Sequence, residues 1–291
     1  MRRVVVALLS LVVGMVSAFV AAGPAAAADC PKLYVIAVPG TWSQNGPGLL
    51  GPVTSGLGPE TQVAVVRYDA TAFPWEAAVY GKSKAQAVSY VKGLAIKKLR
   101  ACPQTKIALT GYSQGADAAG DVANEIGSGR EAIRPNQIAG VVLLADPRRS
   151  AKDTLIGPEL SGQGSGGPRL NGMGWLSAKT RTICIPTDLY CNTPRDYYIT
   201  RIIGYLAETS NPTPSQIGVY QAEASAIFVE MLTRGGPGRV VAEVSNTRAR
   251  QQIIAFNRFI QSRSHGDYGS FEVKPGVTAT EWARNYLADL A

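Results

Sequence analysis

The sequence predicts a doubly wound α/β fold with a mostly parallel sheet. Stretches with strand character alternate with helical stretches over residues 32–126, an order that produces parallel strands joined by crossover helices. The run 138–145 is apolar throughout, as expected of a strand that is buried on both faces. A glycine-bounded turn follows the strand expected at 106–110, and in such folds the working residues gather at the carboxyl ends of the strands.

The expected elements follow one another in a regular order. Strands are expected, in sequence, at 32–38, 62–68, 106–110, 138–145 and 181–185. A long helix is expected over 82–100, where apolar residues recur at helical spacing, namely Val88, Val91, Leu94, Ala95 and Leu99. An alanine-rich helix is expected after the third strand and ends near residue 126. The stretch 157–174 is glycine-rich and aperiodic, which predicts a mobile surface loop.

Residues 192–264 have a different, all-helical pattern. Helices are expected at 197–207, 222–234 and 246–263. The last of them carries an apolar stripe formed by Ile253, Ile254, Phe256, Phe259 and Ile260. Two interpretations are open: the helices simply pack on the sheet, or they form a lid or acyl-binding cap over an active site.

Residues 1–28 have the pattern of a signal peptide. Two arginines precede an acid-free apolar run over 4–22 and then an alanine-rich stretch, which is the order used for Sec export. Cleavage near residue 28 leaves 29–291 as a single α/β-type domain, large enough for one core. An uncleaved amino-terminal anchor is the alternative, because the apolar run is long. The sequence therefore predicts a secreted or cell-envelope location.

Charge and composition narrow the partners. The formal net charge is +8, but the basic residues are scattered and form no Lys/Arg run. This argues against nucleic-acid binding, whereas the positive surplus suits peripheral contact with a negatively charged envelope or lipid surface. The chain has a single histidine and no Cys-x-x-Cys pair, so neither a metal nor a cofactor is expected.

Four cysteines in an exported chain predict two disulfides, with three possible connectivities. Cys184 and Cys191 bracket a six-residue turn and would form a local clamp. Cys30 and Cys102 each precede a proline near the start of an expected strand.

The strongest chemical signal is Gly111-Tyr112-Ser113-Gln114-Gly115, which lies between an apolar strand and a helix. In this context the pattern predicts a nucleophile elbow, in which glycine is needed at both ends because a side chain there would collide with a neighbouring element. Ser113 would stand at the amino end of a helix, where the dipole favours developing negative charge. The alternative is an ordinary glycine-bounded turn with a capping serine.

A serine hydroxyl needs a base, and His265 is the only histidine in the chain. If Ser113 is a nucleophile, His265 must be the base, and its position late in the chain fits the order serine, acid, histidine. Taken alone, a single histidine near the carboxyl terminus is usually an ordinary surface residue. The surrounding loop would leave the imidazole exposed and movable.

The acid that orients the imidazole is expected between these two residues. Asp188 is favoured, because it lies in the 184–191 loop, where a disulfide would fix the backbone. Asp146 is the rival, since it ends the preceding strand, although it is followed by arginines with which it could pair. Asp117 and Asp267 are assigned structural roles.

An oxyanion hole requires donors aimed at the tetrahedral oxygen. The backbone amide of Gln114, directly after Ser113, is the first candidate. The second is Thr41, through its amide and hydroxyl, because Gly40 permits a sharp bend after the first strand.

Together, these features resemble the cutinase family, in particular the cutinase-like esterases of mycolate-containing actinobacteria. The resemblance covers about residues 30–191 and resumes near His265. It implies an α/β-hydrolase fold and a secreted serine ester hydrolase that acts on lipid or acyl esters without a cofactor. The residues it implies are Ser113, Asp188 and His265 as triad, Thr41 and Gln114 as oxyanion hole, and the bridges Cys30 to Cys102 and Cys184 to Cys191.

The chain departs from a short cutinase by the helical stretch 192–264 before His265. This insertion is similar to that of mycobacteriophage lysin B enzymes, which are mycolyl-arabinogalactan esterases. It favours long-chain esters, such as cell-envelope glycolipids, over cutin, and a monomeric enzyme is expected. The alternatives are an acyl(mycolyl)transferase and a non-catalytic envelope-binding protein on the same fold.

Overall fold

The computed structural model describes most of the chain beyond its amino-terminal segment. The described residues are 30–210, 217–218, 221–225, 229, 233 and 246–291. The chain divides into two units, Met1–Cys30 and Pro31–Ala291, and the description below concerns the second. The signal peptide predicted at 1–28 lies outside the described residues.

A six-stranded sheet forms the centre of the unit, with strand order β2-β1-β3-β4-β6-β5 and every neighbouring pair parallel. Its strands are β1 (Leu33–Val38), β2 (Thr61–Val65), β3 (Lys106–Tyr112), β4 (Ile138–Leu144), β5 (Leu155–Ile156) and β6 (Thr180–Ile183). The predicted doubly wound, mostly parallel sheet is thus confirmed. The short edge strand β5 was not predicted, because two residues carry no readable pattern.

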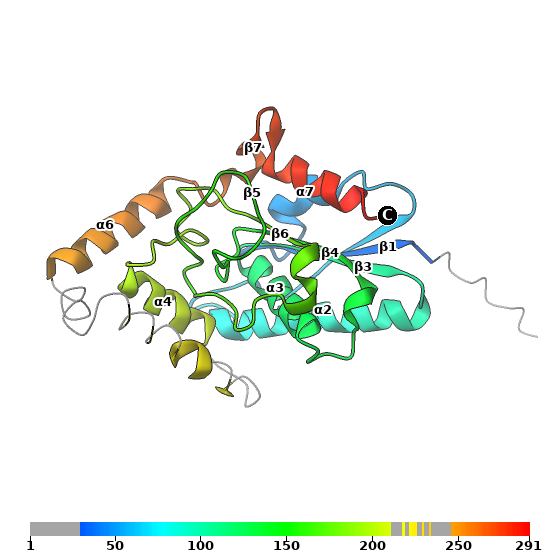
Figure 1. Cartoon of the computed structure of the whole chain (residues 1–291), viewed down its shortest axis with the longest axis horizontal. Helices are drawn as coiled ribbons and strands as arrows, with labels where there is room; N and C mark the ends of the chain where they lie inside the picture. The colour runs from blue at the N-terminus through cyan, green and yellow to red at the C-terminus, as the bar shows by residue number, and fades with distance from the viewer. Residues whose placement is uncertain (1–29, 211–216, 219–220, 226–228, 230–232, 234–245) are drawn as a thin grey trace, which may run out of the picture. The chain divides into compact units, whose positions relative to one another are not determined.

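Helices cover both faces of this sheet (Figure 1). On one face pack α2 (Tyr80–Ala101) and α3 (Gln114–Gly127), and on the other α1 (Gly51–Thr54) and α7 (Ala279–Ala288). Alternate residues of β1 enter the two cores, with Ile36 in the first and Val35 in the second. Both faces are buried, which explains why the central strands read as continuous apolar runs.

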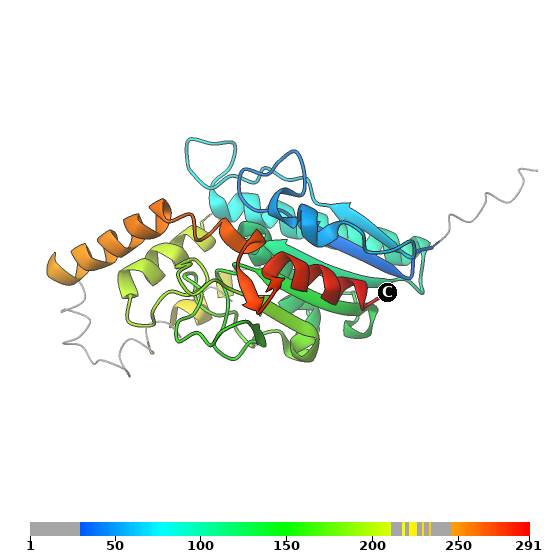
Figure 2. The ribbon, with the colours of Figure 1, turned by 90° about the horizontal axis from the view of Figure 1, so that it is seen from above.

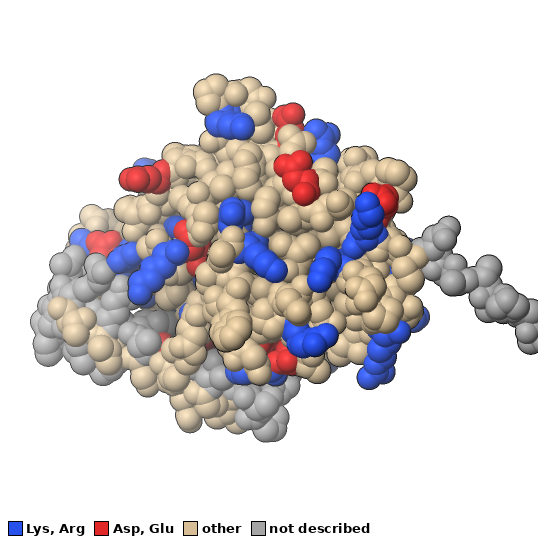
Figure 3. All heavy atoms as spheres, turned by 45° about the vertical axis from the view of Figure 1, so that its right-hand side comes forward, with Lys and Arg blue, Asp and Glu red and all other residues tan. Residues whose placement is uncertain are grey.

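Short 3-10 helices connect several of these elements: η1 (Gly48–Leu50), η2 (Pro135–Gln137), η3 (Gly174–Lys179) and η4 (Asp267–Gly269). Lysine and arginine side chains are separated by other residues on the face seen in Figure 3. The basic surplus is therefore not gathered into one patch on that face.

The carboxyl-terminal elements were missed from the sequence. After η4 the chain forms an antiparallel hairpin, β7 (Glu272–Lys274) and β8 (Val277–Thr278), and ends with α7. The Thr278 hydroxyl accepts a hydrogen bond from the Glu281 amide at the start of α7. Thr278-x-x-Glu281 is the signature of a helix amino terminus and was the signal available for this helix.

The expectation of a surface loop at 157–174 is wrong for its central part. Residues 162–167 and Arg169 are buried. A Cβ atom at Gly164 would lie 2.0 Å from the carbonyl oxygen of Pro147. The glycines therefore allow close packing against neighbouring backbone, and they do not indicate a mobile segment here.

The all-helical stretch contains α4 (Tyr198–Glu208) and α6 (Asn246–Gln261), which agrees with two of the three predicted helices. Figures 1 and 2 show both helices beyond one end of the sheet, on the side away from the C-terminus. Of the helix predicted at 222–234, residues 222–225, 229 and 233 are helical and the others lie outside the described residues. Among the described helices, none is both long and apolar enough to cross a membrane.

All four cysteines are in disulfides. Cys184 pairs with Cys191, which closes the predicted local clamp. Cys30 and Cys102 are disulfide-bonded as well.

Candidate active site

Ser113 is the single residue between the end of β3 and the start of α3. Its backbone has φ 58° and ψ −127°, a left-handed conformation that is strained for a residue with a side chain. Its amide donates a hydrogen bond to the Leu144 carbonyl at 3.0 Å, which ties the turn to β4. The sharp turn is therefore held in place by the sheet beside it.

The two glycines of the motif are required by contacts that the structure shows. A Cβ atom at Gly111 would lie 2.3 Å from the carbonyl oxygen of Gly115. A Cβ atom at Gly115 would lie 2.0 Å from the carbonyl oxygen of Val38 on β1. No side chain fits at either position, as the sequence predicted.

His265 follows α6 and reaches the serine from the carboxyl-terminal part of the chain. Its Nε2 lies 2.8 Å from Ser113 Oγ. The imidazole is 30 % exposed, so it is less open to solvent than the loop composition suggested.

Aromatic rings surround the imidazole. The ring centroids of Tyr190, Tyr112 and Phe259 lie 4.9, 5.3 and 6.0 Å from that of His265. The Tyr112 hydroxyl also donates a hydrogen bond to the His265 carbonyl. These contacts fix both the ring and the backbone of His265.

Asp188 lies on the other side of the imidazole and is fully buried. Its Oδ2 is 2.9 Å from His265 Nδ1, while its Oδ1 accepts a hydrogen bond from the Tyr190 amide at 3.0 Å. The Cys184–Cys191 disulfide closes the loop that carries it. The structure thus brings Ser113, His265 and Asp188 into one hydrogen-bonded line.

Tyr268 is part of this site, although no motif in the sequence points to it. Its buried hydroxyl donates to Asp188 Oδ2 at 2.7 Å, the same oxygen that faces the imidazole. Burial, together with the charge of Asp188, raises the pKa of Tyr268 well above its ordinary value. The phenol therefore stays protonated and acts as a positioning residue for the carboxylate.

Removing this hydroxyl should weaken the site without abolishing it. In Tyr268→Phe we expect kcat to fall about tenfold with KM nearly unchanged, because one hydrogen bond to a charged group is lost. Without this donor the Asp188 carboxylate is held less firmly beside the imidazole. The rate at which a fluorophosphonate labels Ser113 should therefore fall in parallel with kcat. A loss of stability in urea denaturation with unchanged kcat would indicate a merely structural role.

The rival acid, Asp146, is placed elsewhere. Its carboxylate pairs with the Arg169 guanidinium at 2.6 Å and accepts a hydrogen bond from the Arg148 amide at 3.0 Å. Burial raises the pKa of Asp146, and the Arg169 charge opposes that rise. Asp146 therefore pairs with an arginine and holds a turn, while Asp188 faces His265.

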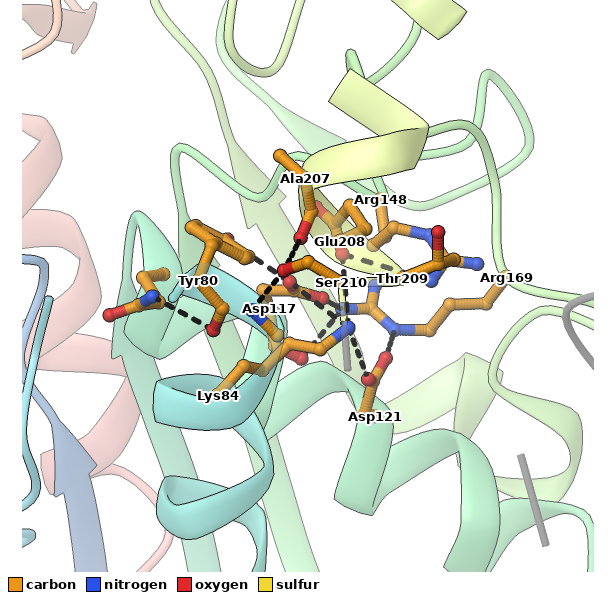
Figure 4. Close-up of polar contacts among 12 residues, drawn as sticks. Tyr80, Lys84, Asp117, Asp121, Arg148, Arg169, Ala207, Glu208, Thr209 and Ser210 are labelled. Carbon is orange, nitrogen blue, oxygen red and sulfur yellow. Dashed lines mark hydrogen bonds and ion pairs between the residues drawn. The ribbon is translucent and has the colours of Figure 1, made fainter. Parts of the chain in front are cut away.

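Asp117 likewise has a structural environment. It accepts a hydrogen bond from Tyr80 at 3.1 Å and pairs with Lys84 at 3.3 Å (Figure 4). Asp267, the other carboxylate assigned a structural role, is exposed in η4.

The two candidate oxyanion donors border the serine. Gln114 is the first residue of α3, where a backbone amide has no partner within the helix. Its buried side chain is fixed by a hydrogen bond from Nε2 to the Thr71 carbonyl at 2.9 Å. Thr41 lies in the turn after β1 and lines the same cavity as Ser113. A Cβ atom at Gly40 would lie 2.8 Å from the Tyr112 ring, so the approach of this turn requires glycine.

An apolar cavity of about 610 Å³ opens beside Ser113 and His265. The α/β core contributes one wall, which includes Thr41, Trp42, Ala72, Phe73 and Leu189. The all-helical stretch contributes the other, with Thr200, Ile203, Ala207, Ile253 and Phe259. Such a cavity has the size and the lining expected of a site for an apolar ligand.

A buried ionic cluster fixes α4, the inner helix of this second wall (Figure 4). Glu208, at the end of α4, pairs with Lys84 of α2 at 3.0 Å. The Ser210 hydroxyl accepts a hydrogen bond from the Gly81 amide at 2.9 Å, and a Cβ atom at Gly204 would lie 2.5 Å from the Ser165 carbonyl oxygen. These contacts leave α4 no room to slide against the core.

The same cluster neutralises the acids behind the elbow. Lys84 and Arg169 both pair with Asp117 and with Asp121. Burial alone would raise the pKa of Asp121, but the charges of Lys84 and Arg169 hold it well below its ordinary value. Within the part of the chain that the structure describes, no group of His, Cys, Asp and Glu side chains is arranged to hold a metal ion.

Comparison with known proteins places the chain in a family. The family model described as Cutinase matches residues 29–215. The chain is a member of the cutinase family. Because the cutinase match ends at residue 215, the link from His265 to Ser113 rests on the structure itself.

Two curated relatives of this cutinase-family chain are named as carboxylesterases. The carboxylesterase Culp6 homolog of Corynebacterium glutamicum is 29 % identical over 205 residues, which cover 57 % of this chain and 66 % of the relative, just under two thirds of its length. The probable carboxylesterase Culp3 of Mycobacterium tuberculosis is 28 % identical over 244 residues, or 79 % and 80 % of the two chains.

Among solved structures, the catalytic core domain of acetyl xylan esterase from Trichoderma reesei has the same fold. It aligns with a TM-score of 0.50 and 19 % identity, and the match covers 69 % of this chain and 100 % of that domain.

Proposed function

We propose that this protein is an exported serine carboxylesterase that hydrolyses long-chain acyl esters of the cell envelope. One observation carries the proposal: Ser113, His265 and Asp188 are joined by hydrogen bonds of 2.8 and 2.9 Å beside an apolar cavity. The carboxylesterase relatives and the cutinase family support the same reaction class.

In the first half of the reaction, His265 Nε2 takes the Ser113 proton while Oγ attacks the ester carbonyl carbon. The resulting imidazolium is stabilised by Asp188. The tetrahedral intermediate then expels the alkoxide, which takes the proton from the imidazolium and leaves as the alcohol. An acyl-enzyme on Ser113 remains.

In the second half, the same imidazole takes a proton from water, and the hydroxide oxygen attacks the acyl carbon. The second tetrahedral intermediate releases the carboxylic acid as Ser113 recovers its proton. In both halves the oxyanion forms beside the Gln114 amide and Thr41. Donors in this place stabilise charge that develops only in the transition state, which lowers the barrier.

The cavity suggests which part of the substrate it holds. Its second wall, formed by α4 and α6, is mostly aliphatic and aromatic, with Thr200 and Gln252 as its polar side chains, and such a wall fits an acyl chain better than a polar alcohol. We therefore assign α4 and α6, the two helices of the stretch 192–264 that line the cavity, to an acyl-binding cap. Two disulfides and the predicted signal peptide support export, because disulfides persist in oxidising compartments.

Covalent labelling tests the nucleophile directly. A fluorophosphonate probe should label the wild-type protein stoichiometrically, and mass spectrometry should place the adduct on Ser113. The control Ser113→Ala, which keeps the fold but lacks the hydroxyl, should remain unlabelled. An unlabelled wild type would instead support a non-catalytic binding protein.

A panel of p-nitrophenyl esters tests the acyl specificity. We expect kcat/KM to rise with acyl length beyond four carbons, because each methylene buried in the cavity contributes about 0.8 kcal/mol. A sharp preference for the shortest esters would contradict the long-chain assignment. Acyl transfer to an added sugar in preference to water would identify a transferase.

A further inference from the structure

The outer helix of the cap, α6, has an unusual charge pattern. Residues 246–264 contain no aspartate or glutamate, and α6 itself carries three arginines. One of them, Arg248, pairs with Asp196 at 2.6 Å. The side chains of Arg250 and Arg258, and that of Arg263 just beyond the helix, are exposed. All the charged side chains of this segment are therefore cationic.

The same helix exposes apolar side chains. Ile253 and Ile254, which belong to the apolar stripe of the helix expected at 246–263, are 55 % and 50 % exposed. Phe259 is buried, whereas the side chains of Phe256 and Ile260 lie outside what the structure describes. A helix that combines exposed apolar groups with cationic ones and has no acids is typical of a lipid–water interface.

Further exposed apolar groups continue this surface around the cavity. On neighbouring α4, Ile203 and Leu206 are exposed, and Ile203 lines the cavity. On the core side, Phe73 lines the cavity and stacks on Trp75, with ring centroids 4.7 Å apart. The Trp75 side chain is 79 % exposed. An apolar rim of this kind marks an interaction surface, and tryptophan is enriched where proteins meet a lipid interface.

We propose that α6 and this apolar rim dock on an anionic lipid surface. The arginines would meet the headgroups, while Ile254 and Trp75 would enter the boundary between headgroups and acyl chains. Because α6 lines the cavity and precedes His265, docking through α6 would place the cavity next to the lipid. A long-chain ester could then enter without crossing water; this last step rests on the proposed function, whereas the binding itself does not.

Charge argues for lipid over a second copy of the chain. A symmetric dimer through α6 would bring its arginines against those of the partner, with no acidic side chain on the helix to offset them. An anionic surface supplies that complement.

Vesicle co-sedimentation tests the proposal, with the chain from residue 29 onward. Residues 1–28 are omitted because an apolar leader would itself bind lipid, and Pro31–Ala291 forms a unit of its own. The wild type should bind vesicles that contain phosphatidylglycerol and should bind pure phosphatidylcholine at least tenfold more weakly. Arg250→Gln/Arg258→Gln should weaken binding to the anionic vesicles about 30-fold, because each arginine near such a surface contributes roughly fivefold.

Two matched controls separate this surface from a general effect of charge or tryptophan. Lys97→Gln/Arg100→Gln removes two exposed cations at the end of α2, and Trp175→Ser removes a tryptophan that is 85 % exposed in η3. Both sites lie near the amino ends of the strands, opposite the end that carries Ser113, because α2 leads into β3 and η3 leads into β6. We expect neither control to change vesicle binding, whereas Trp75→Ser should weaken it several-fold.

Three results would contradict the proposed docking surface. The proposal is overturned if the wild type does not bind anionic vesicles, if both charge pairs lower binding equally, or if the Arg250/Arg258 pair instead abolishes a dimer. Fluorophosphonate labelling of every variant reports on the fold and the active site. If the wild-type protein binds lipid but is not labelled, the proposed function is wrong and the proposed docking surface is still supported.

Discussion

Asp188→Asn should lower kcat about 10⁴-fold while leaving KM nearly unchanged. The reason lies in the three hydrogen-bond partners of this side chain, the Tyr190 amide, the Tyr268 hydroxyl and the imidazole. The Tyr190 amide donates to Oδ1, so that position must keep an oxygen, and the new amide nitrogen must take the place of Oδ2. This nitrogen would donate one hydrogen to the Tyr268 hydroxyl oxygen and the other to His265 Nδ1, which forces the imidazole proton onto Nε2, the nitrogen that faces Ser113. An imidazole in that tautomer cannot accept the serine proton.

The measurement is steady-state hydrolysis of a p-nitrophenyl ester together with the rate of fluorophosphonate labelling, and both should fall in parallel. Asp146→Asn is the matched control, because Asp146 is an equally buried aspartate that pairs with Arg169 and not with the imidazole. We expect it to lower stability and to leave kcat within a few-fold of wild type. A large loss of kcat in Asp146→Asn, with Asp188→Asn nearly active, would reverse the assignment of the acid.

The residues of this site differ in how far they could be predicted. The elbow around Ser113 is recognisable from five consecutive residues, although only the requirement for Gly111 is local. Gly111 faces the Gly115 carbonyl, whereas Gly115 faces the Val38 carbonyl on β1. His265 was reachable only because the chain contains no other histidine. Asp188 was separated from Asp146 by the cysteines on either side of it, and the structure places only Asp188 against the imidazole.

Tyr268 and Arg169 lay beyond the reach of the sequence for a physical reason. The importance of each depends on partners far away in the chain: Tyr268 on Asp188, and Arg169 on acids from α3 and from the end of β4. Spacing carries no signal for such contacts. Arg169 also lies in the glycine-rich stretch 157–174, whose composition suggested a surface loop and whose close packing appears only in three dimensions.

Arg169 offers the largest expected effect on stability. Its guanidinium is almost fully buried and pairs with Asp146, Asp121 and Asp117 at 2.6, 2.8 and 3.4 Å. In Arg169→Met, Lys84 still pairs with Asp117 and Asp121, but Asp146 loses its side-chain ion pair. An uncompensated buried charge costs about 3–5 kcal/mol, so the free energy of unfolding should fall by that amount, as measured by urea denaturation.

The loss of stability in Arg169→Met should depend on pH, because Asp146 is a buried carboxyl. Burial raises the pKa of Asp146 above its unfolded value even in the wild type, and loss of the Arg169 charge raises it further. A carboxyl whose pKa is raised on folding destabilises the folded state as pH increases through that pKa. The destabilisation caused by Arg169→Met should therefore be small near the ordinary pKa of an aspartate and grow toward neutral pH. The double variant Arg169→Met/Asp146→Asn has no buried charge at position 146 and should recover part of the loss at pH 7. A deficit that is the same at every pH, and is not relieved by the second substitution, would mean that Arg169 stabilises the fold through packing and not through charge.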